Sequence, residues 1–240
     1  VRWLGGYTQS WSNVACNQSL ALTEGLVAHW SFEEANDATT ADASHHANTG
    51  GIHGASLLAQ ASPAGGTHVL SFDGADDYVS VPDSASLDVD SQLTVSAWVY
   101  LESADSSPVI VSKQDAYTLE VVNGKVLFGV QTNGAGWFGL TSVSAVPLAQ
   151  WVHVAGAALT GDPTDLVIYI DGVRDAYLAQ GATAGLVPND NALTLGARQG
   201  TSRFLHGMLD DVRVSEKLFS DSQISRSADS DQDSLADGWE

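Results

Sequence analysis

The sequence is poor in cysteine, in positive charge and in long apolar runs. Its 240 residues include a single cysteine, Cys16, so neither an intrachain disulfide nor a cysteine-based zinc site can form. Lys and Arg number 9 against 29 Asp and Glu, and this formal charge of -20 repels phosphate backbones and anionic lipid headgroups. No stretch approaches the roughly 20 apolar residues that a membrane helix needs. We therefore expect neither a nucleic-acid partner nor insertion into a membrane.

The acidity has two interpretations, which are compatible with each other. Excess Asp and Glu keep a protein soluble in salty surroundings, and they also supply ligands for divalent cations. With 44% hydrophobic residues, the chain is long enough to bury one large core. The first residue is Val1 rather than methionine, which is typical of a processed or excised fragment.

Apolar residues alternate at period two through most of the chain, which predicts β-strands. Asn123-Gly124 and Asp171-Gly172 separate such runs and favour type I′ hairpin turns, in which both central residues need positive φ. About a dozen strands joined by Gly, Asn and Asp turns predict an all-β, two-sheet antiparallel sandwich. One short helix is expected at 219–226, with Ser220 as its cap and Asp221 in its first turn.

The chain divides into three parts by composition. Residues 1–24 show no sustained alternation, so their structure is uncertain. Residues 25–226 carry the predicted sandwich, in whose strands we expect Trp30, Trp98 and Trp151 to face the core. Residues 227–240 form an acidic tail or linker with almost no core-forming residues.

Six segments occur in an order that resembles a known family. They are "GLVAHWSFEE", "DASHHANTGGIHGA", "VLSFDGADDYVSVPDSASLDVDSQLTVSAWVYL", "WVHVAG", "LVIYIDGV" and "HGMLDDVRVSEKLFSDSQI". Together they resemble the laminin-G-like, concanavalin A-like jelly rolls of secreted bacterial proteins. The resemblance implies two curved antiparallel sheets, bound Ca2+, and recognition of glycans or of matrix and cell-surface proteins. It also implies an extracellular location and further domains of the same polypeptide.

The resemblance also implies where calcium would bind. Members of the family carry acidic or amide residues after the first strand, in the "FDG" turn and in the last strand. The matching positions here are Asp42, Asn48, Asp73, Asp76, Asp77, Asp210 and Asp211. Because first and last strands of such sandwiches commonly pair, these groups are expected to surround one ion with the six to eight oxygens that calcium takes. The alternative is that the aspartates start turns or face solvent.

A second calcium site is predicted at the C-terminus. Asp229, Asp231, Asp233, Asp237 and Glu240 have the spacing of an EF-hand loop, although Ser234 replaces the glycine usual at its sixth place. The stretch also resembles the start of a thrombospondin type 3 repeat, which implies a calcium-stiffened linker. The alternative is an acidic, disordered end.

A ligand-binding surface is expected around the glycine-rich segment "QTNGAGWFGLTS". Neutral sugars are held by aromatic rings against their C–H faces and by planar amides on their hydroxyls. The candidates are Gln131, Asn133, Trp137 and Phe138, with Tyr117 and Arg198 completing a rim. In the rival interpretation the loop is an ordinary hairpin whose Trp137 packs over a sheet edge.

Catalytic patterns are absent from the sequence. A retaining glycosidase needs two carboxyl groups about 5 to 5.5 Å apart, yet no E-x-D-x-E strand occurs, and Glu120 stands alone on "YTLEVV". The expected function is therefore a non-catalytic, calcium-dependent or calcium-stabilised glycan-binding module of a larger secreted bacterial protein. One alternative is a protein-binding or adhesion module of the same fold. A second alternative is a polysaccharide-active enzyme, either a glycosidase or a lyase.

Overall fold

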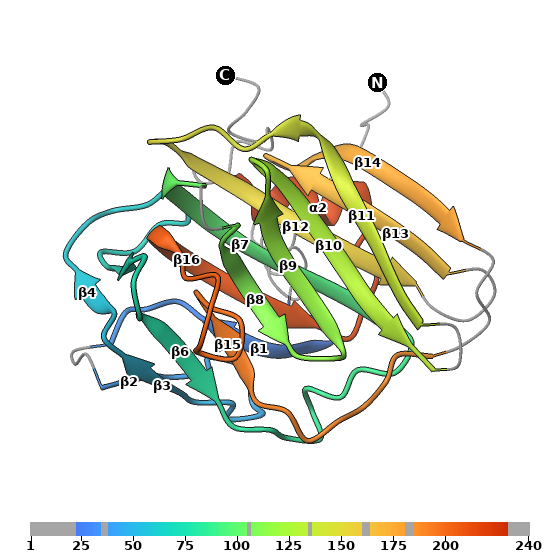
Figure 1. The fold of residues 1–240 in the computed structure, drawn as a ribbon, viewed down its shortest axis with the longest axis horizontal. Coiled ribbons are helices and arrows are strands. Elements are labelled where there is room, and N and C mark those ends of the chain that lie inside the picture. Colours follow the sequence, from blue (N-terminus) through green and yellow to red (C-terminus); the bar gives the residue numbers. More distant parts are fainter. Residues whose placement is uncertain are drawn as a thin grey trace, which may run out of the picture.

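The computed structural model describes residues 23–34, 38–104, 107–133, 136–159, 164–180 and 185–229. In these ranges the chain forms two stacked antiparallel sheets and one short helix (Figure 1). The prediction of an all-β, two-sheet sandwich is confirmed. The first strand begins at Leu26 and the last helix ends at Ser227.

The first sheet is built around its longest strand. Its order is β14 (Val173–Gln180), β13 (Thr164–Ile170), β12 (Trp151–Leu159), β7 (Gln92–Ser103), β16 (His206–Ser215), β5 (Val69–Asp73) and β4 (Ser56–Leu58), while β1 (Leu26–Trp30) also pairs with β16. Strand β7 joins β12 on one side to β16 on the other. The expected pairing of the first and last strands is therefore present.

The second sheet faces the first across the core. Its order is β11 (Gly136–Ala145), β10 (Lys125–Thr132), β9 (Tyr117–Val122), β8 (Val109–Lys113), β15 (Leu193–Leu195), β6 (Tyr78–Val81), β3 (Gly50–His53) and β2 (Thr39–Thr40). In Figure 1 the strands β8 to β11 of this sheet lie in front of β7, β12 and β13.

Alternation along the strands builds one core between the sheets. On β9, for example, Tyr117, Leu119 and Val121 face inward, so Thr118 and Glu120 lie on the outer face. The sheets approach closely where Gly156 of β12 meets Phe128 of β10. An ideal Cβ at Gly156 would lie 2.2 Å from Cγ of the Phe128 ring. The Phe128 ring can pack against β12 because Gly156 has no side chain.

The predicted helix is present as α2 (Asp221–Ser227) on the outer face of the first sheet. Ser220 is its N-cap and forms a capping box with Gln223. Phe219 and Ile224 fix the helix to the sheet by packing with outward-facing apolar residues of β12 and β13.

The local predictions agree with the structure in most places. Asn123 and Gly124 have φ of 53° and 75°, and Asp171 and Gly172 have φ of 46° and 73°, as type I′ hairpins require. Trp30 lies in the core as expected. Trp98 is buried on the outer face of the first sheet, because its neighbours Ala97 and Val99 face the core, and it contacts His153 there. Trp151 is only partly buried beside Tyr100. No helix in the described part of the chain is long and apolar enough to cross a membrane.

The contact between Gly156 and Phe128 can be tested by adding one methyl group. We expect Gly156→Ala to lower the free energy of unfolding by about 1–3 kcal/mol, because the close-packed core must shift to accept it. Urea denaturation measures the change. The control is Gly51→Ala, where the nearest atoms to the added Cβ are 3.7 Å away. Equal unfolding midpoints for the two variants would contradict this account of the contact.

Candidate functional site

A tryptophan side chain lies on the outer face of the second sheet near its edge. Trp137 of β11 pairs with Gln131 of β10, and its side chain is 46% exposed. The indole lies over Gly129, where an ideal Cβ would come within 2.4 Å of the ring atom Cζ2. Gly129 itself pairs with Gly139, whose ideal Cβ would lie 3.5 Å from the indole Nε1. Two paired glycines thus leave room for a large ring against the sheet surface.

A cavity of about 330 Å³ opens beside this ring. Four residues proposed from the sequence line it, namely Trp137, Gln131, Tyr117 and Arg198; the other lining residues are Ser112, Lys113, Gln114, Asp115 and Thr118. The volume is at the lower end of the range typical of small-molecule sites. The structure therefore brings four of the six proposed residues together at one cavity, and five of its nine lining residues were not proposed.

The other two proposed ligand-binding residues lie outside this cavity lining. Asn133 is exposed in the turn after β10, and Phe138 faces the interior, where it packs against the core. Because neighbouring residues of a strand face opposite sides, Trp137 and Phe138 cannot both be on the outer face. Tyr117 lines the cavity, but its side chain belongs to the core, and its hydroxyl donates to the Leu87 carbonyl at 3.3 Å.

A loop between β15 and β16 closes one end of the cavity. Arg198 and Arg203 each donate to the same oxygen, Oε2 of Glu120, at 2.6 Å. The Glu120 side chain is only 5% exposed, so the loop is fastened to β9 by a nearly buried carboxylate. The loop also covers the outer face at β15, where the Thr194 hydroxyl donates to the Ala197 carbonyl at 2.7 Å.

The sequence analysis considered Glu120 only as a catalytic acid without a partner. Its arginine partners lie about 80 residues further along the chain, and no local pattern joins them. The alternation of β9 was the one available signal, because it places Thr118 and Glu120 on the outer face together.

The lysine at the base of the cavity is fully engaged with the protein. Lys113 is buried, and its Nζ donates to Asp83 at 2.5 Å and to the carbonyls of Asn189 and Asn191 at 2.9 Å. Asp88 lies 3.4 Å from the same nitrogen. This ammonium group ties β8 to two loops and offers no free charge to a ligand.

Two of the predicted calcium groups use their oxygens within the protein. Asp42 accepts hydrogen bonds from the backbone N–H groups of His29, Ser44 and Asn48. The buried Asn48 side chain donates to the Val27 carbonyl and accepts from Ser84. These contacts fasten the loop after β1 and already use oxygen atoms of both residues.

The aspartates of β16 are also engaged. Asp211 has φ of 47° at a bulge and accepts from His29 at 2.6 Å and from Arg213 at 2.9 Å. Burial opposes ionisation of Asp211, but the charges of Arg213 and His29 lower its pKa to about 2. Asp210 accepts from Ser62, and burial together with neighbouring carboxylates raises its pKa to about 7.

The third group is gathered into a cluster. Among the described residues, Asp73, Asp76 and Asp77 form the one set of three acidic, His or Cys residues whose ligand atoms lie within 4.8 Å of one another. Asp77 is buried, which raises its pKa, and the charges of Asp73 and Asp76 raise it further. Asp229 follows α2, while Asp231, Asp233, Asp237 and Glu240 lie outside the described residues.

A family model for the concanavalin A-like lectin/glucanases superfamily matches residues 73–225, well over half of the chain. The chain belongs to this superfamily. The predicted resemblance to laminin-G-like, concanavalin A-like jelly rolls is thereby confirmed. No curated protein matches the chain.

Solved structures of this superfamily fold include bacterial binding domains. Domain 4 of AbnA, an extracellular arabinanase from Geobacillus stearothermophilus solved with arabinotriose, is 18% identical with a TM-score of 0.67, covering 85% of this chain and 98% of that one. The binding domain of Paraclostridial Mosquitocidal Protein 1 has 12% identity and a TM-score of 0.67, covering 85% and 52%. The binding domain of botulinum neurotoxin DC, in complex with SialylT, has 12% identity and a TM-score of 0.65, covering 85% and 51%.

The present chain spans about half the length of the two toxin binding domains. At these identities the likeness establishes the jelly-roll fold, which agrees with the two sheets described above.

The arginine-carboxylate contact that closes the cavity gives a stability prediction. We expect Glu120→Gln to lower the free energy of unfolding by about 1–3 kcal/mol, because two guanidinium groups lose the charge they share. Urea denaturation measures the loss, and hydrogen exchange should show faster opening at 198–203. The control is Glu102→Gln, whose side chain is 53% exposed beside His206. Equal losses in the two variants would show that the shared carboxylate does not hold the loop.

Proposed function

We propose that the chain is a non-catalytic glycan-binding module that binds a short, neutral saccharide in the cavity beside Trp137. The observation that carries the proposal is the half-exposed indole, held over paired glycines at the mouth of a cavity with an amide from Gln131. An indole face offers a surface for the C–H face of a sugar ring, and an amide can bind its hydroxyls. The arabinotriose complex of the related-fold arabinanase domain supports this ligand class.

Charge favours a neutral ligand. The two cationic residues that line the cavity, Lys113 and Arg198, are both paired with carboxylates of the protein. The carboxylate of Asp115 is exposed at the rim. A phosphate, sulfate or uronate would therefore meet no free positive charge and would approach a chain with a formal charge of -20.

The same lining supports a binding role rather than catalysis. Asp115 is the one carboxylate among the described lining residues, whereas glycoside hydrolysis ordinarily uses two on either side of the scissile bond. The module would work by attaching a larger secreted protein to its glycan target. A purely protein-binding role is the competing proposal, supported by a toxin binding domain of similar fold in complex with rat synaptotagmin II.

The glycan-binding proposal is tested with one variant and a control on the same strand. Trp137→Ala should weaken binding of neutral oligosaccharides at least tenfold, because it removes the stacking surface. An array of arabinan-, xylan-, cellulose- and mannan-derived oligosaccharides identifies a binder, and isothermal titration calorimetry measures its affinity. Val143→Ala, at a side chain 71% exposed on β11, should leave the affinity unchanged. Absence of binding to every oligosaccharide would overturn the proposal in favour of a protein partner.

We also propose that Asp73, Asp76 and Asp77 hold a calcium ion that stabilises the module. Three carboxylates within 4.8 Å fit part of an oxygen coordination shell. Burial and the charges of Asp73 and Asp76 raise the pKa of Asp77, and a cation would relieve the repulsion between these charges. Asp73 and Asp77 each accept one backbone N–H group as well. The loop at Asp42 and the pair Asp210 and Asp211 are weaker candidates, because Asp42 accepts three backbone N–H groups and the charge of Asp211 is neutralised by Arg213 and His29.

Thermal unfolding with calcium and with EDTA tests this second proposal. Calcium at about 100 times its dissociation constant should raise the free energy of unfolding by about 2.7 kcal/mol. The gain should persist when residues 230–240 are removed and should be lost in Asp76→Asn. Asp115→Asn, which removes an exposed carboxylate elsewhere, is the matched control. A calcium effect that survives Asp76→Asn but vanishes with the tail would assign the ion to the EF-hand-like spacing instead.

A further inference from the structure

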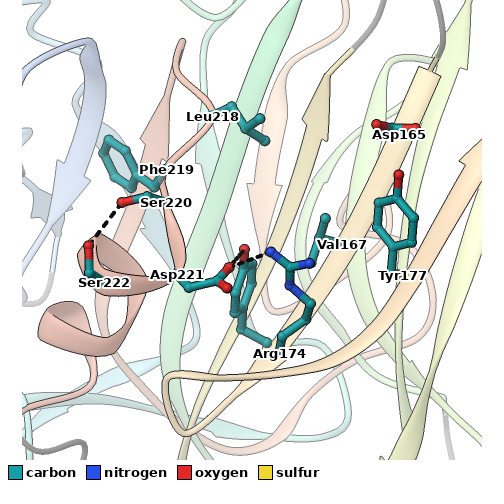
Figure 2. Close-up of a pocket in the computed structure, with 10 residues that line it drawn as sticks. Asp165, Val167, Arg174, Tyr177, Leu218, Phe219, Ser220, Asp221 and Ser222 are labelled. Atoms are coloured by element: carbon teal, nitrogen blue, oxygen red, sulfur yellow. Dashed lines mark hydrogen bonds and ion pairs between the residues drawn. The ribbon is translucent and has the colours of Figure 1, made fainter.

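A second hollow lies on the opposite sheet, where the edge strand β14 and its neighbour β13 meet the segment that leads into α2 (Figure 2). Its volume of about 590 Å³ exceeds that of the cavity beside Trp137. The lining residues are Asp165, Val167, Tyr169, Arg174, Tyr177, Leu218, Phe219, Ser220, Asp221 and Ser222, and we call this hollow the Tyr177 groove. None of these residues was proposed as a binding residue from the sequence.

The Tyr177 groove combines a rigid floor with exposed apolar sides. Val167 and Tyr169 project from the outer face of β13. They form the buried floor of the groove and pack with Phe219. Tyr177 is 52% exposed and Leu218 is 38% exposed. In Figure 2 these two side chains stand at different sides of the hollow, with Val167 between them. The groove therefore presents a ring face and an aliphatic side chain to a ligand from fixed elements.

Polar groups in the groove are held in place by one another. Asp221 Oδ1 accepts from the Tyr169 hydroxyl at 2.8 Å and from Arg174 at 2.7 Å. Burial and the hydrogen bond to Asp221 raise the pKa of Tyr169 to about 12, so this hydroxyl keeps its proton at neutral pH. These two hydrogen bonds hold Asp221 and Arg174 in place before a ligand binds. Less conformational entropy is therefore lost on binding.

Asp165 is the least satisfied polar group of the groove. In Figure 2 the Tyr177 hydroxyl points toward Asp165, and the interaction with this carboxylate raises the pKa of the tyrosine. Oδ1 of Asp165, in contrast, is buried and has no hydrogen-bond partner among the described residues. A buried acceptor without a donor costs free energy, so a hydroxyl group brought by a ligand would be favourable there.

The charge of the groove selects the class of ligand. One guanidinium, from Arg174, faces the two carboxylates of Asp165 and Asp221, so the net charge is negative and an anionic ligand is disfavoured. Carboxylate oxygens and a guanidinium bind hydroxyl groups, while the Tyr177 ring and Leu218 can cover the C–H face of a sugar ring. We propose that the Tyr177 groove is a second site for a neutral saccharide.

This site points away from the Trp137 cavity, because the two lie on the outer faces of opposite sheets. A short oligosaccharide bound in one cannot reach the other. A branched or multi-chain glycan can occupy both, which raises its overall avidity without any new contact. The inference shares its ligand class with the proposed function but rests on different residues, so the two can fail separately.

Calorimetry on four forms of the whole chain separates the two sites. The forms are wild type, Trp137→Ala, Tyr177→Ala and the double variant, each titrated with neutral oligosaccharides that bind wild type on the array. We expect Trp137→Ala to retain one weaker binding event and the double variant to lose it at least tenfold. Val173→Ala, at a side chain 40% exposed on the same strand but outside the lining, should behave as wild type.

Two further variants guard against indirect effects. Asp165→Asn should weaken the residual binding several-fold while circular dichroism and the unfolding midpoint stay unchanged, and Tyr177→Phe should lose less than Tyr177→Ala because it keeps the ring. The inference is overturned if Trp137→Ala abolishes all binding while Tyr177→Ala matches Val173→Ala. It is also overturned if a lysine-rich peptide, and no saccharide, binds at Tyr177. Loss of binding in Tyr177→Ala alone would instead contradict the proposal for Trp137.

Discussion

Burial between two sheets is the constraint on which the rest of this molecule depends. Every long strand must turn one row of side chains toward the other sheet, and packing of these rows excludes water from a single core. The fit is close enough that a glycine is needed where the Phe128 ring crosses β12 at Gly156. Because the inner rows are committed to the core, chemistry that requires solvent has to be carried by the outer rows, the strand ends and the loops.

The two outer faces use this freedom in different ways. On the second sheet, glycines at paired positions let Trp137 lie against the strands, and a loop held by Glu120 closes the hollow beside it. On the first sheet, a capped helix supplies the missing wall, and its first residue, Asp221, is also a polar group of the hollow. In both cases a rigid sheet provides the floor while a later segment of chain provides the closure. Binding residues on such fixed elements lose little freedom when a ligand arrives.

Alternation and turn chemistry were sufficient to predict the fold from the sequence. The two hairpins and the capped helix follow from local rules, since Asn-Gly, Asp-Gly and a capping serine act on their immediate neighbours. The exposure of Trp137 could also be inferred, because a tryptophan near several glycines is hard to bury. What sequence could not supply is register. The pairing of Gly129 with Gly139 and the approach of Arg203 to Glu120 depend on strand alignment and on loop closure over long separations.

The surroundings of the aspartates could not be predicted from the sequence either. Asp42, Asp77 and Asp211 carry the same side chain in three different surroundings. Asp42 accepts three backbone N–H groups, Asp77 is buried beside other carboxylates, and the charge of Asp211 is neutralised by Arg213 and His29. A carboxylate can serve as a cation ligand only if its lone pairs are not already used, and that depends on donors that arrive from distant strands. Spacing in the sequence therefore does not show which of these carboxylates are free to bind a cation.

Most of the few positive side chains are paired with carboxylates of the protein, so little positive charge is left for a ligand. In the part of the chain that the structure describes, six Lys and Arg residues form ion pairs with carboxylates of the same chain, namely Lys113, Arg174, Arg198, Arg203, Arg213 and Lys217. The remaining carboxylates outnumber the remaining cations by far, so the field around the protein is negative. Such a field repels anionic polymers at a distance and has little effect on an uncharged one. In the proposed glycan-binding role, a module of this charge would discriminate against acidic glycans before contact, and its hollows would then need only shape, ring faces and hydroxyl-binding groups to select among neutral ones.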